Sequence, residues 1–144
     1  NSKNMGKKLI IALLLFLSAT SAIKAQDKVA ETGKIYFLRS TGFAGSAAAF
    51  KTFIDGEFVC KLNNKKYSIH EVPVGKHECS VQFGGKKSKD KAEKFEVLVE
   101  AGKITYVQLV FEMGAFINNI YCEEVTANTA TQKMKMMEED TKCL

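Results

Sequence analysis

The side chains with the greatest chemical potential in this sequence are its thiols and imidazoles. There are four cysteines and two histidines: Cys60, Cys79, Cys122, Cys143, His70 and His77. Such groups form disulfides, bind metals, act as nucleophiles or move protons. However, the cysteines lack the CxxC spacing of redox and zinc motifs, and each histidine stands apart from a second ligand at metal-binding spacing. We therefore expect neither a metal nor another cofactor.

The pairing of the cysteines depends on which thiols the fold brings together. Cys60 alternates with Phe58 and Leu62 along one predicted strand, so these three side chains share a face. Cys79 shares a face of another strand with His77. Cys60 and Cys79 are therefore either buried thiols or a disulfide that bridges two strands. Four cysteines allow three full pairings, and the sequence does not choose among them.

A Cys–His nucleophilic pair is the catalytic arrangement that the spacing offers, since His77 and Cys79 lie two residues apart. Their side chains point to the same side of a strand. Val81 makes that side a core face, where a thiol is inert. The serines lack a GxSxG context, and the segment GFAGS lacks the lysine and the helix of a phosphate-binding loop. We therefore expect a protein that is not an enzyme and has no catalytic residues.

The segments that position these side chains are short strands separated by turn signals. Asp55-Gly56, Asn63-Asn64 and Pro73-Val74-Gly75 are typical of tight turns. The predicted strands are 34–39, 48–54, 57–62, 66–72, 76–83, 94–100, 104–111 and 120–125. Strands at this spacing, without helices between them, predict an all-β fold, an antiparallel Ig-like β-sandwich. The strand 104–111 is the most apolar, so we expect it to be central.

The C-terminal residues change from a strand pattern to a helical one. Thr126 is a suitable cap for a helix that runs to about Asp140. Within it, only Ala130, Met134 and Met137 share a face. We therefore expect a short C-terminal α-helix that lies against the sandwich, with an adaptable methionine-rich binding surface as the alternative.

The N-terminal residues have the three parts of a secretory signal peptide. Lys7 and Lys8 precede an apolar stretch from Leu9 to Leu17, and small residues follow. The stretch is shorter than the roughly 20 residues that a membrane span needs. We expect cleavage after Ala25, or alternatively after Ala22, and an exported protein in the periplasm or at the cell surface. A retained membrane anchor is the other interpretation.

The expected organisation and charge of the mature protein follow from this cleavage. The predicted parts are a signal peptide at 1–25 with 1–4 upstream of its start, a linker at 26–32, a β-sandwich at 33–125, and a helix and tail at 126–144. Residues 1–25 hold four lysines and no acid, so cleavage changes the net charge from +5 to 5 − 4 = +1. This small charge argues against a nucleic-acid partner, which requires a basic face.

Binding is the function class that these exclusions leave. Arg39, Phe43 and Phe116 are the candidate partner-binding residues, because exposed aromatic and arginine side chains dominate the energetics of interfaces. We expect the partner to be a protein of the cell envelope. The lysine-rich segment 84–91 is interpreted as a solvated loop, so any membrane contact is expected to be weak. A small apolar ligand or lipid held between the sheets is the alternative.

Three segments resemble the bacterial family catalogued as domain of unknown function 2846. They are KIYFLRSTGFAGSAAAFKTFIDGEFVCKL, VPVGKHECSV and FEVLVEAGKITYVQL, between about Gly33 and Glu124. The residues that carry the resemblance are Arg39, Gly45, Ser46, Asp55, Gly56, Pro73, Gly75, Lys76, His77, Glu100, Ala101, Gly102, Lys103 and Tyr106. The stretch around Asp55-Gly56 also resembles PEGA-type surface modules, which are small β-sandwiches. The resemblance implies an exported all-β domain and no particular reaction, although this chain lacks the lipid-attachment cysteine that family members often carry.

Overall fold

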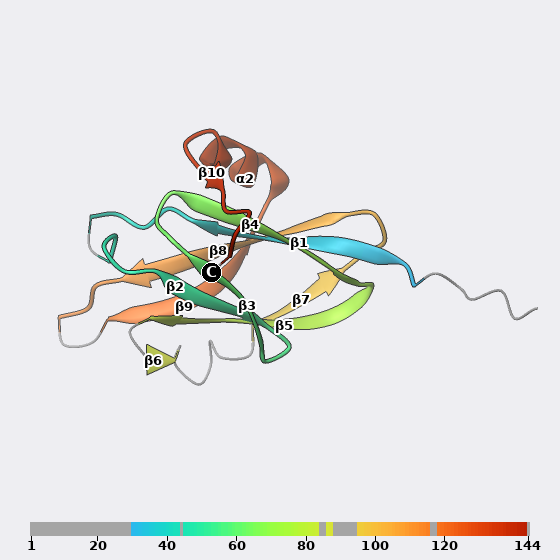
Figure 1. Ribbon diagram of the computed structural model, residues 1–144, viewed down its shortest axis with the longest axis horizontal. Helices are drawn as coiled ribbons and strands as arrows, with labels where there is room; N and C mark the ends of the chain where they lie inside the picture. The colour runs from blue at the N-terminus through green and yellow to red at the C-terminus, as the bar shows by residue number, and fades with distance from the viewer. Residues whose placement is uncertain (1–29, 44, 84–85, 88–94, 116–117, 144) are drawn as a thin grey trace, which may run out of the picture.

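Two β-sheets pack face to face, with one short helix outside them (Figure 1). The computed structural model describes residues 30–43, 45–83, 86–87, 95–115 and 118–143. The elements are β1 (Thr32–Arg39), β2 (Phe50–Ile54), β3 (Glu57–Leu62), β4 (Lys66–Pro73), β5 (Gly75–Phe83), β6 (Lys86–Lys87), β7 (Phe95–Val99), β8 (Ile104–Glu112), β9 (Asn119–Val125), α2 (Ala127–Met134) and β10 (Glu138–Glu139). The predicted β-sandwich with a short C-terminal helix is confirmed. The predicted signal peptide lies outside the described residues.

The two sheets differ in strand order. Sheet A has the order β10-β4-β1-β8-β9, and sheet B places β2 between β3 and β5, with β6 and β7 also paired to β5. Most pairs are antiparallel, but β1 pairs in parallel with β8, and β10 in parallel with β4. The strand predicted to be central, β8, does lie inside its sheet, between β1 and β9.

The core lies between the sheets and is built from alternate residues of each strand. Its fully buried apolar side chains include Ile35, Phe37, Phe50, Leu62, Val99 and Val107. Burial of one such side chain contributes about 1.5–3 kcal/mol to folding. The period-two pattern of the sequence therefore determines which side of each strand faces the other sheet.

A β-bulge in β3 corrects one predicted core position. Thr52 pairs with Cys60 and Phe53 pairs with Phe58, so Val59 is an extra residue in β3. An extra residue reverses the alternation of side chains beyond it. Phe58 is consequently 50% exposed while Cys60 is fully buried. The expectation that Phe58 and Cys60 share a face is therefore wrong.

Helix α2 is shorter than the sequence predicts. Thr126 caps the helix as expected, because its side chain accepts a hydrogen bond from a backbone N–H of the first turn. The helix ends at Met134 rather than near Asp140. The chain then joins sheet A as β10, where the Glu138 N–H donates to the carbonyl oxygen of Lys65 over 3.0 Å. Pairing with an open strand edge thus prevails over continuation of the helix.

We call the residues from Thr126 to Cys143 the C-terminal strap. Its helix α2 lies above the outer face of sheet A, and β10 pairs with the strand β4 (Figure 1). The chain then runs past β4 to Cys143, which is bonded to Cys60 on β3 of sheet B. The strap thus links the two sheets covalently, and the sandwich extends beyond the boundary predicted at Val125. In the part of the chain that is described, no helix is long and apolar enough to cross a membrane.

Candidate functional site

Three tyrosines from neighbouring strands meet on the outer face of sheet A. The ring centroid of Tyr36 on β1 lies 6.2 Å from that of Tyr67 on β4, with nearly parallel planes, and 5.4 Å from that of Tyr106 on β8, edge to face. Alternation explains their orientation, because Ile35 and Phe37 point into the core and Tyr36 between them points outward. We call Tyr36, Tyr67 and Tyr106 the tyrosine face.

The tyrosine face combines apolar ring surface with hydroxyl groups. All three tyrosines are partly buried, so their rings are held by neighbours while some surface stays accessible. Partial burial and the neighbouring Tyr106 and Tyr67 raise the pKa of Tyr36, so its hydroxyl stays protonated at neutral pH and can donate a hydrogen bond. A ring with a polar tip suits a surface that exchanges water for a partner.

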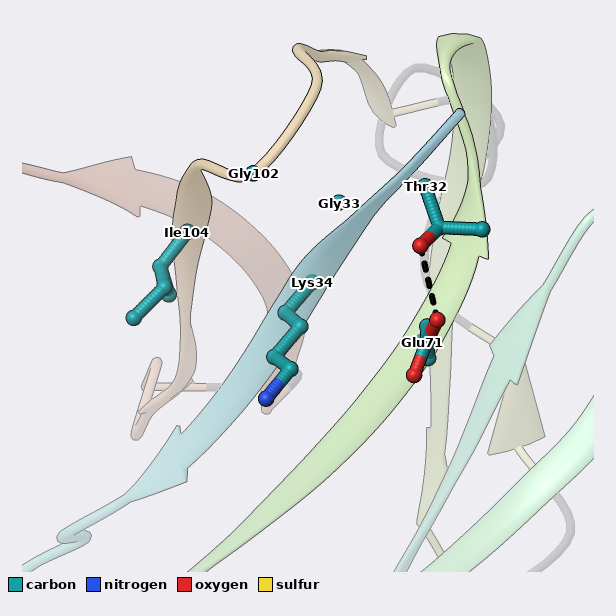
Figure 2. A pocket seen from close by; sticks show the side chains of 6 residues that line it. All are labelled: Thr32, Gly33, Lys34, Glu71, Gly102 and Ile104. Atoms are coloured by element: carbon teal, nitrogen blue, oxygen red, sulfur yellow. Dashed lines mark hydrogen bonds between the residues drawn. The ribbon is translucent and has the colours of Figure 1, made fainter. Parts of the chain in front are cut away.

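A hollow of about 210 Å³ adjoins this face at one end (Figure 2). Its lining residues are Thr32, Gly33, Lys34, Glu71, Gly102 and Ile104. Lys34 and Ile104 pair with each other two residues before the pair Tyr36 and Tyr106, so the hollow continues the same surface. The hydroxyl of Thr32 donates to Glu71 over 2.7 Å. A cation and a carboxylate therefore lie at the rim of the aromatic surface.

The helix of the C-terminal strap covers the other end of the outer face. Leu38 points outward by alternation yet has no exposed surface, and Ala130 of α2 is also fully buried. Neither residue belongs to the core cluster between the sheets. The helix therefore packs over this part of sheet A (Figure 1). Along β1 the hollow lies at Lys34, the tyrosine face at Tyr36 and the covered position at Leu38, so the tyrosine face lies between the hollow and α2.

Arg39 is buried, which contradicts the prediction that it anchors a partner at the surface. Its guanidinium carbon lies 3.6 Å from the ring centroid of Phe50, and its side chain has no exposed area. One terminal nitrogen donates to the carbonyl oxygen of Leu62 and the other to that of Gly45, each over 2.6 Å. Burial lowers the pKa of Arg39 to about 10, so the group is still charged at neutral pH. Arg39 instead ties β1 to β3 and to the first loop from inside.

The loop after β1 exposes Phe43 completely. The N–H and hydroxyl of Ser46 both donate to the carbonyl oxygen of Phe43, which closes the loop. Gly45 has φ of +78°, and a Cβ there would lie 3.2 Å from the ring of Phe111, so this loop conformation requires glycine. The exposure of Phe43 agrees with the sequence interpretation, and its contact with a partner stays a prediction. Phe116, the third candidate, lies outside the described residues.

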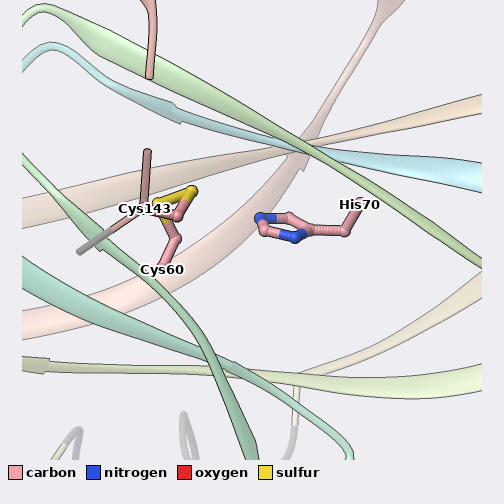
Figure 3. Close-up of side chains that lie close together, drawn as sticks. All are labelled: Cys60, His70 and Cys143. Atoms are coloured by element: carbon pink, nitrogen blue, oxygen red, sulfur yellow. A yellow bond between two sulfur atoms is a disulfide. The ribbon is translucent and has the colours of Figure 1, made fainter. Parts of the chain in front are cut away.

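The disulfide joins Cys60 to Cys143, so the alternative that pairs Cys60 with Cys79 is wrong, and Cys79 is a buried thiol (Figure 3). Cys60 lies on β3 and Cys79 on β5, and β2 separates these two strands. Two strand spacings amount to roughly 9–10 Å, whereas a disulfide requires Cα atoms within about 7 Å. The disulfide that does form indicates an oxidising compartment.

His70 lies beside this disulfide (Figure 3). Both sulfur atoms and a ring nitrogen of His70 lie within 4.8 Å of one another. Nε2 of His70 is 2.9 Å from the hydroxyl of Ser68, and the ring packs edge-on against Phe37 with 5.7 Å between centroids. Burial lowers the pKa of His70, so the imidazole is neutral at neutral pH. The fold thus brings together two cysteines and a histidine whose sequence spacing predicts no shared site.

The other two cysteines, Cys79 on β5 and Cys122 on β9, are free and buried. Burial raises the pKa of Cys79 to about 12 and also raises the pKa of Cys122. Both thiols therefore stay protonated at neutral pH, and a protonated thiol is a poor nucleophile.

His77 is held between two hydrogen-bond acceptors rather than next to an activated thiol. Its Nδ1 lies 2.7 Å from a carboxylate oxygen of Asp55, and its Nε2 lies 2.7 Å from the carbonyl oxygen of Pro73. Since both partners accept, both ring nitrogens donate, which requires the protonated imidazole. Burial alone would lower the pKa of His77, but the bonds to Asp55 and Pro73 raise it overall.

The sequence predicts that Asp55 fixes its own turn. In the structure Asp55 also binds residues of a neighbouring strand. One carboxylate oxygen accepts the backbone N–H of Glu78 on β5 over 2.8 Å, and the other binds His77. Burial would raise the pKa of Asp55, yet these hydrogen bonds lower it overall. Asp55 thus fastens the β2–β3 turn to the neighbouring strand.

The tyrosine face was not among the sequence-predicted sites. Alternation does predict that Tyr36 points away from the core, and the same rule applies to Tyr67 and Tyr106. Their meeting depends on the parallel pairing of β1 with β8, which joins segments that are far apart in the chain. The residue pattern within a single strand does not predict which other strand it pairs with.

These features define a disulfide-linked β-sandwich domain with an aromatic outer surface. A family model described as a protein of unknown function, DUF2846, matches residues 29–121. That match covers more than half of the 144 residues, so the chain belongs to this family. No curated protein matches the chain. Because the family description assigns no activity, function has to be argued from the geometry.

Proposed function

We propose that the protein is an exported, non-catalytic binding module of the cell envelope and that a protein partner binds at the tyrosine face. The observation that carries this proposal is the contact of Tyr36, Tyr67 and Tyr106 on one outer surface. The charged residues Lys34 and Glu71 lie at its rim. Protein interfaces have this anatomy, with aromatic residues enriched and charged residues depleted at the centre and a polar rim around them.

Export is supported by two independent features. The first is the order of lysines, apolar stretch and small residues in 1–25, which is a property of the sequence. The second is the disulfide between Cys60 and Cys143. Cytosolic thiols are kept reduced, so a structural disulfide of this kind favours a location beyond the cytoplasm.

The arrangement of the potentially reactive side chains favours binding over catalysis. Cys79 and Cys122 are held in the protonated state by burial. His77 and Asp55 are bonded to each other and to backbone groups of neighbouring segments. Arg39 is bonded to two backbone carbonyl oxygens. Enzymes often use such side chains in catalysis. Here the bonded side chains hold strands and loops together.

The alternative of an apolar ligand between the sheets has less support. Phe50, Phe83 and Phe111 form a mutual cluster at one end of the core, with centroids 5.1–6.0 Å apart. Phe50 belongs to one continuous cluster of fourteen buried side chains, and Phe83 and Phe111 pack against that cluster. Side chains that pack on one another in this way fill the interior themselves.

Photo-crosslinking in intact cells tests the proposal. A benzophenone amino acid is introduced at Tyr106, where it preserves an aromatic ring, and in a second variant at Leu98, which is exposed on the outer face of sheet B. We expect the Tyr106 variant to crosslink to one envelope protein in good yield, and the Leu98 variant to crosslink weakly and without preference.

The contradicting outcomes are equally specific. Equal crosslinking from both positions would mean that the partner does not prefer the outer face of sheet A. A lipid adduct in place of a protein adduct at Tyr106 would reject the protein partner and indicate that the outer face of sheet A contacts lipid. Retention of the intact disulfide in both variants, measured by mass, is the control for folding.

A further inference from the structure

Three metal-ligating side chains from distant parts of the chain meet where the C-terminal strap joins sheet B. Cys60 belongs to β3, His70 to β4, and Cys143 to the segment after β10. Their two sulfur atoms and a ring nitrogen lie within 4.8 Å of one another, and the ring of His70 extends toward the sulfurs (Figure 3). No other group of this kind is found in the described ranges.

The fold holds two of these groups rigidly and leaves freedom to the third. Cys60 is fully buried in a core strand. The ring of His70 is oriented by the hydroxyl of Ser68 at 2.9 Å and by the edge of Phe37. Cys143 lies outside regular structure, where its N–H donates to a carboxylate oxygen of Asp140 over 3.1 Å. A ligand set with one adjustable member can open from disulfide spacing to the wider spacing of two metal-bound sulfurs.

We propose that reduction of the Cys60–Cys143 disulfide converts this place into a binding site for a thiophilic metal ion, with Zn²⁺ as the expected ion, held by two thiolates and the imidazole of His70. Zn²⁺ combines readily with cysteine sulfur and histidine nitrogen in a tetrahedral arrangement. Three protein ligands leave the fourth position to water. Sequence spacing does not predict this ligand set, because 83 residues separate the two cysteines.

The conversion balances with a dithiol as the reductant. The dithiol supplies two electrons and two protons, the S–S bond between Cys60 and Cys143 breaks to give two thiols, and the sulfurs of the dithiol become a disulfide. Zn²⁺ then displaces the two thiol protons to solvent as the metal–sulfur bonds form. Restoration of the disulfide by an oxidant would expel the metal, so occupancy would follow the redox state of the protein.

Metal titration of the purified, tag-free protein in two redox states tests this inference. Co²⁺ is used as the probe because thiolate coordination gives charge-transfer absorption and tetrahedral coordination gives visible bands. We expect the reduced protein to bind one Co²⁺ with both features, Zn²⁺ to displace it, and the oxidised protein to show neither feature.

Two variants each remove one ligand, and one control variant leaves all three ligands in place. Cys143→Ser and His70→Asn should each weaken metal binding by about 100-fold or more. His77→Asn, which alters the other histidine, should bind as the wild type does. The Cys143→Ser variant also retains Cys79 and Cys122, so it measures any contribution from those thiols.

Thermal unfolding with and without Zn²⁺ covers the case in which the reduced protein is weakly folded. Zn²⁺ should raise the unfolding temperature of the reduced wild type and leave that of the oxidised protein unchanged. The inference is overturned if reduced wild type binds no stoichiometric metal, if Cys143→Ser binds as tightly as wild type, or if Zn²⁺ stabilises neither form. None of these results depends on the partner proposed for the tyrosine face.

Discussion

The two outer faces of the sandwich differ in how their exposed residues are arranged. On sheet B, charges such as Lys51, Lys61, Lys76 and Glu96 point outward. The ring of Phe58 on β3 contacts that of Phe53 on β2, with centroids 5.9 Å apart, and Leu98 lies apart from them on β7. On sheet A, the three tyrosines are on three adjacent strands, and the ring of Tyr36 contacts those of both Tyr67 and Tyr106. Both faces obey the same alternation. The difference lies in the extent of the aromatic contact, which joins three strands on sheet A and two strands on sheet B.

The same contrast extends to how each face is covered. The described surface contacts of sheet B include the exposed ion pair of Lys76 with Glu96 at 2.7 Å, which contributes little to stability. Sheet A carries the C-terminal strap, whose far end is bonded to β3 of the opposite sheet. The aromatic surface is therefore bordered by a segment whose position depends on the disulfide.

Loss of the disulfide should have the largest effect on stability. Cys143→Ser opens a loop of 83 residues, and the chain-entropy argument predicts a loss of about 4 kcal/mol in unfolding free energy. Urea unfolding without reductant measures it. With a reductant and no metal present, the wild type and the variant should have similar stability. A difference below about 1 kcal/mol without reductant would show that the strap does not depend on the disulfide.

Replacement of Arg39 should have the next largest effect and should weaken both sheets together. Arg39→Met removes two buried hydrogen bonds and leaves the carbonyl oxygens of Leu62 and Gly45 without their donor. We expect a loss of about 2–3 kcal/mol. Hydrogen exchange followed residue by residue should show faster exchange in β1 and β3 alike. Unchanged protection in β3 would contradict the role of Arg39 as a link between the sheets.

The Asp55–His77 pair joins the β2–β3 turn to β5 of sheet B and, through the carbonyl oxygen of Pro73, to the end of β4 in sheet A, and its contribution should depend on pH. The raised pKa of His77 gives stability that is fully present below its ordinary value of 6.5 and is lost as pH rises through the raised value. The lowered pKa of Asp55 gives stability that is present above its ordinary value of 3.8 and is lost on acidification. The pair therefore contributes most between these two values.

Asp55→Asn isolates this charge effect, because asparagine tolerates the positive φ of 52° and still accepts from Glu78. We expect a loss of about 1 kcal/mol near pH 5, since the half-exposed carboxylate is screened by solvent. The difference from wild type should shrink near pH 8.5, as measured by unfolding at both pH values. A difference that does not vary with pH would mean that His77 is neutral in the folded protein.

The smallest effect on stability is expected at the tyrosine face itself. Tyr106→Ser should lower the unfolding free energy by no more than about 1 kcal/mol, since cross-strand pairs on one face contribute roughly 0.2–1 kcal/mol each. Leu98→Ser, the matched change on sheet B, should be close to neutral. A loss of several kcal/mol from Tyr106→Ser would indicate that the tyrosines are structural residues rather than a binding surface.

Local patterns in the sequence predict most of the strands but not how distant segments meet. Asp55-Gly56 and Pro73-Val74-Gly75 locate turns because few residues adopt their backbone angles, and alternation identifies core residues such as Phe37. The bulge at Val59 breaks that alternation without a sequence signal. The end of α2 was missed because an open strand edge, which exists only in the folded sheet, determines where the helix stops.

The candidate sites depend on contacts over long sequence distances, which explains why few of their residues were predicted. Arg39 is charged, and charge normally implies exposure, but two buried carbonyl oxygens and the ring of Phe50 compensate it inside the core. Cys60 meets Cys143 only because the strap crosses from one sheet to the other. Several residues that carry the family resemblance, such as Gly45 and His77, prove to hold the fold together.

The affinity of the crosslinked envelope protein for face variants tests the central claim most directly. The partner recovered through Tyr106 is titrated with wild type, with Tyr36→Ser/Tyr106→Ser on sheet A, and with Phe58→Ser/Leu98→Ser on sheet B. Our account predicts that the sheet A pair weakens binding by about 30-fold or more, as expected when central interface residues are lost. It predicts a change below about threefold for the sheet B pair, as for residues outside the interface. Equal weakening by both pairs, or none by the tyrosine pair, would contradict it.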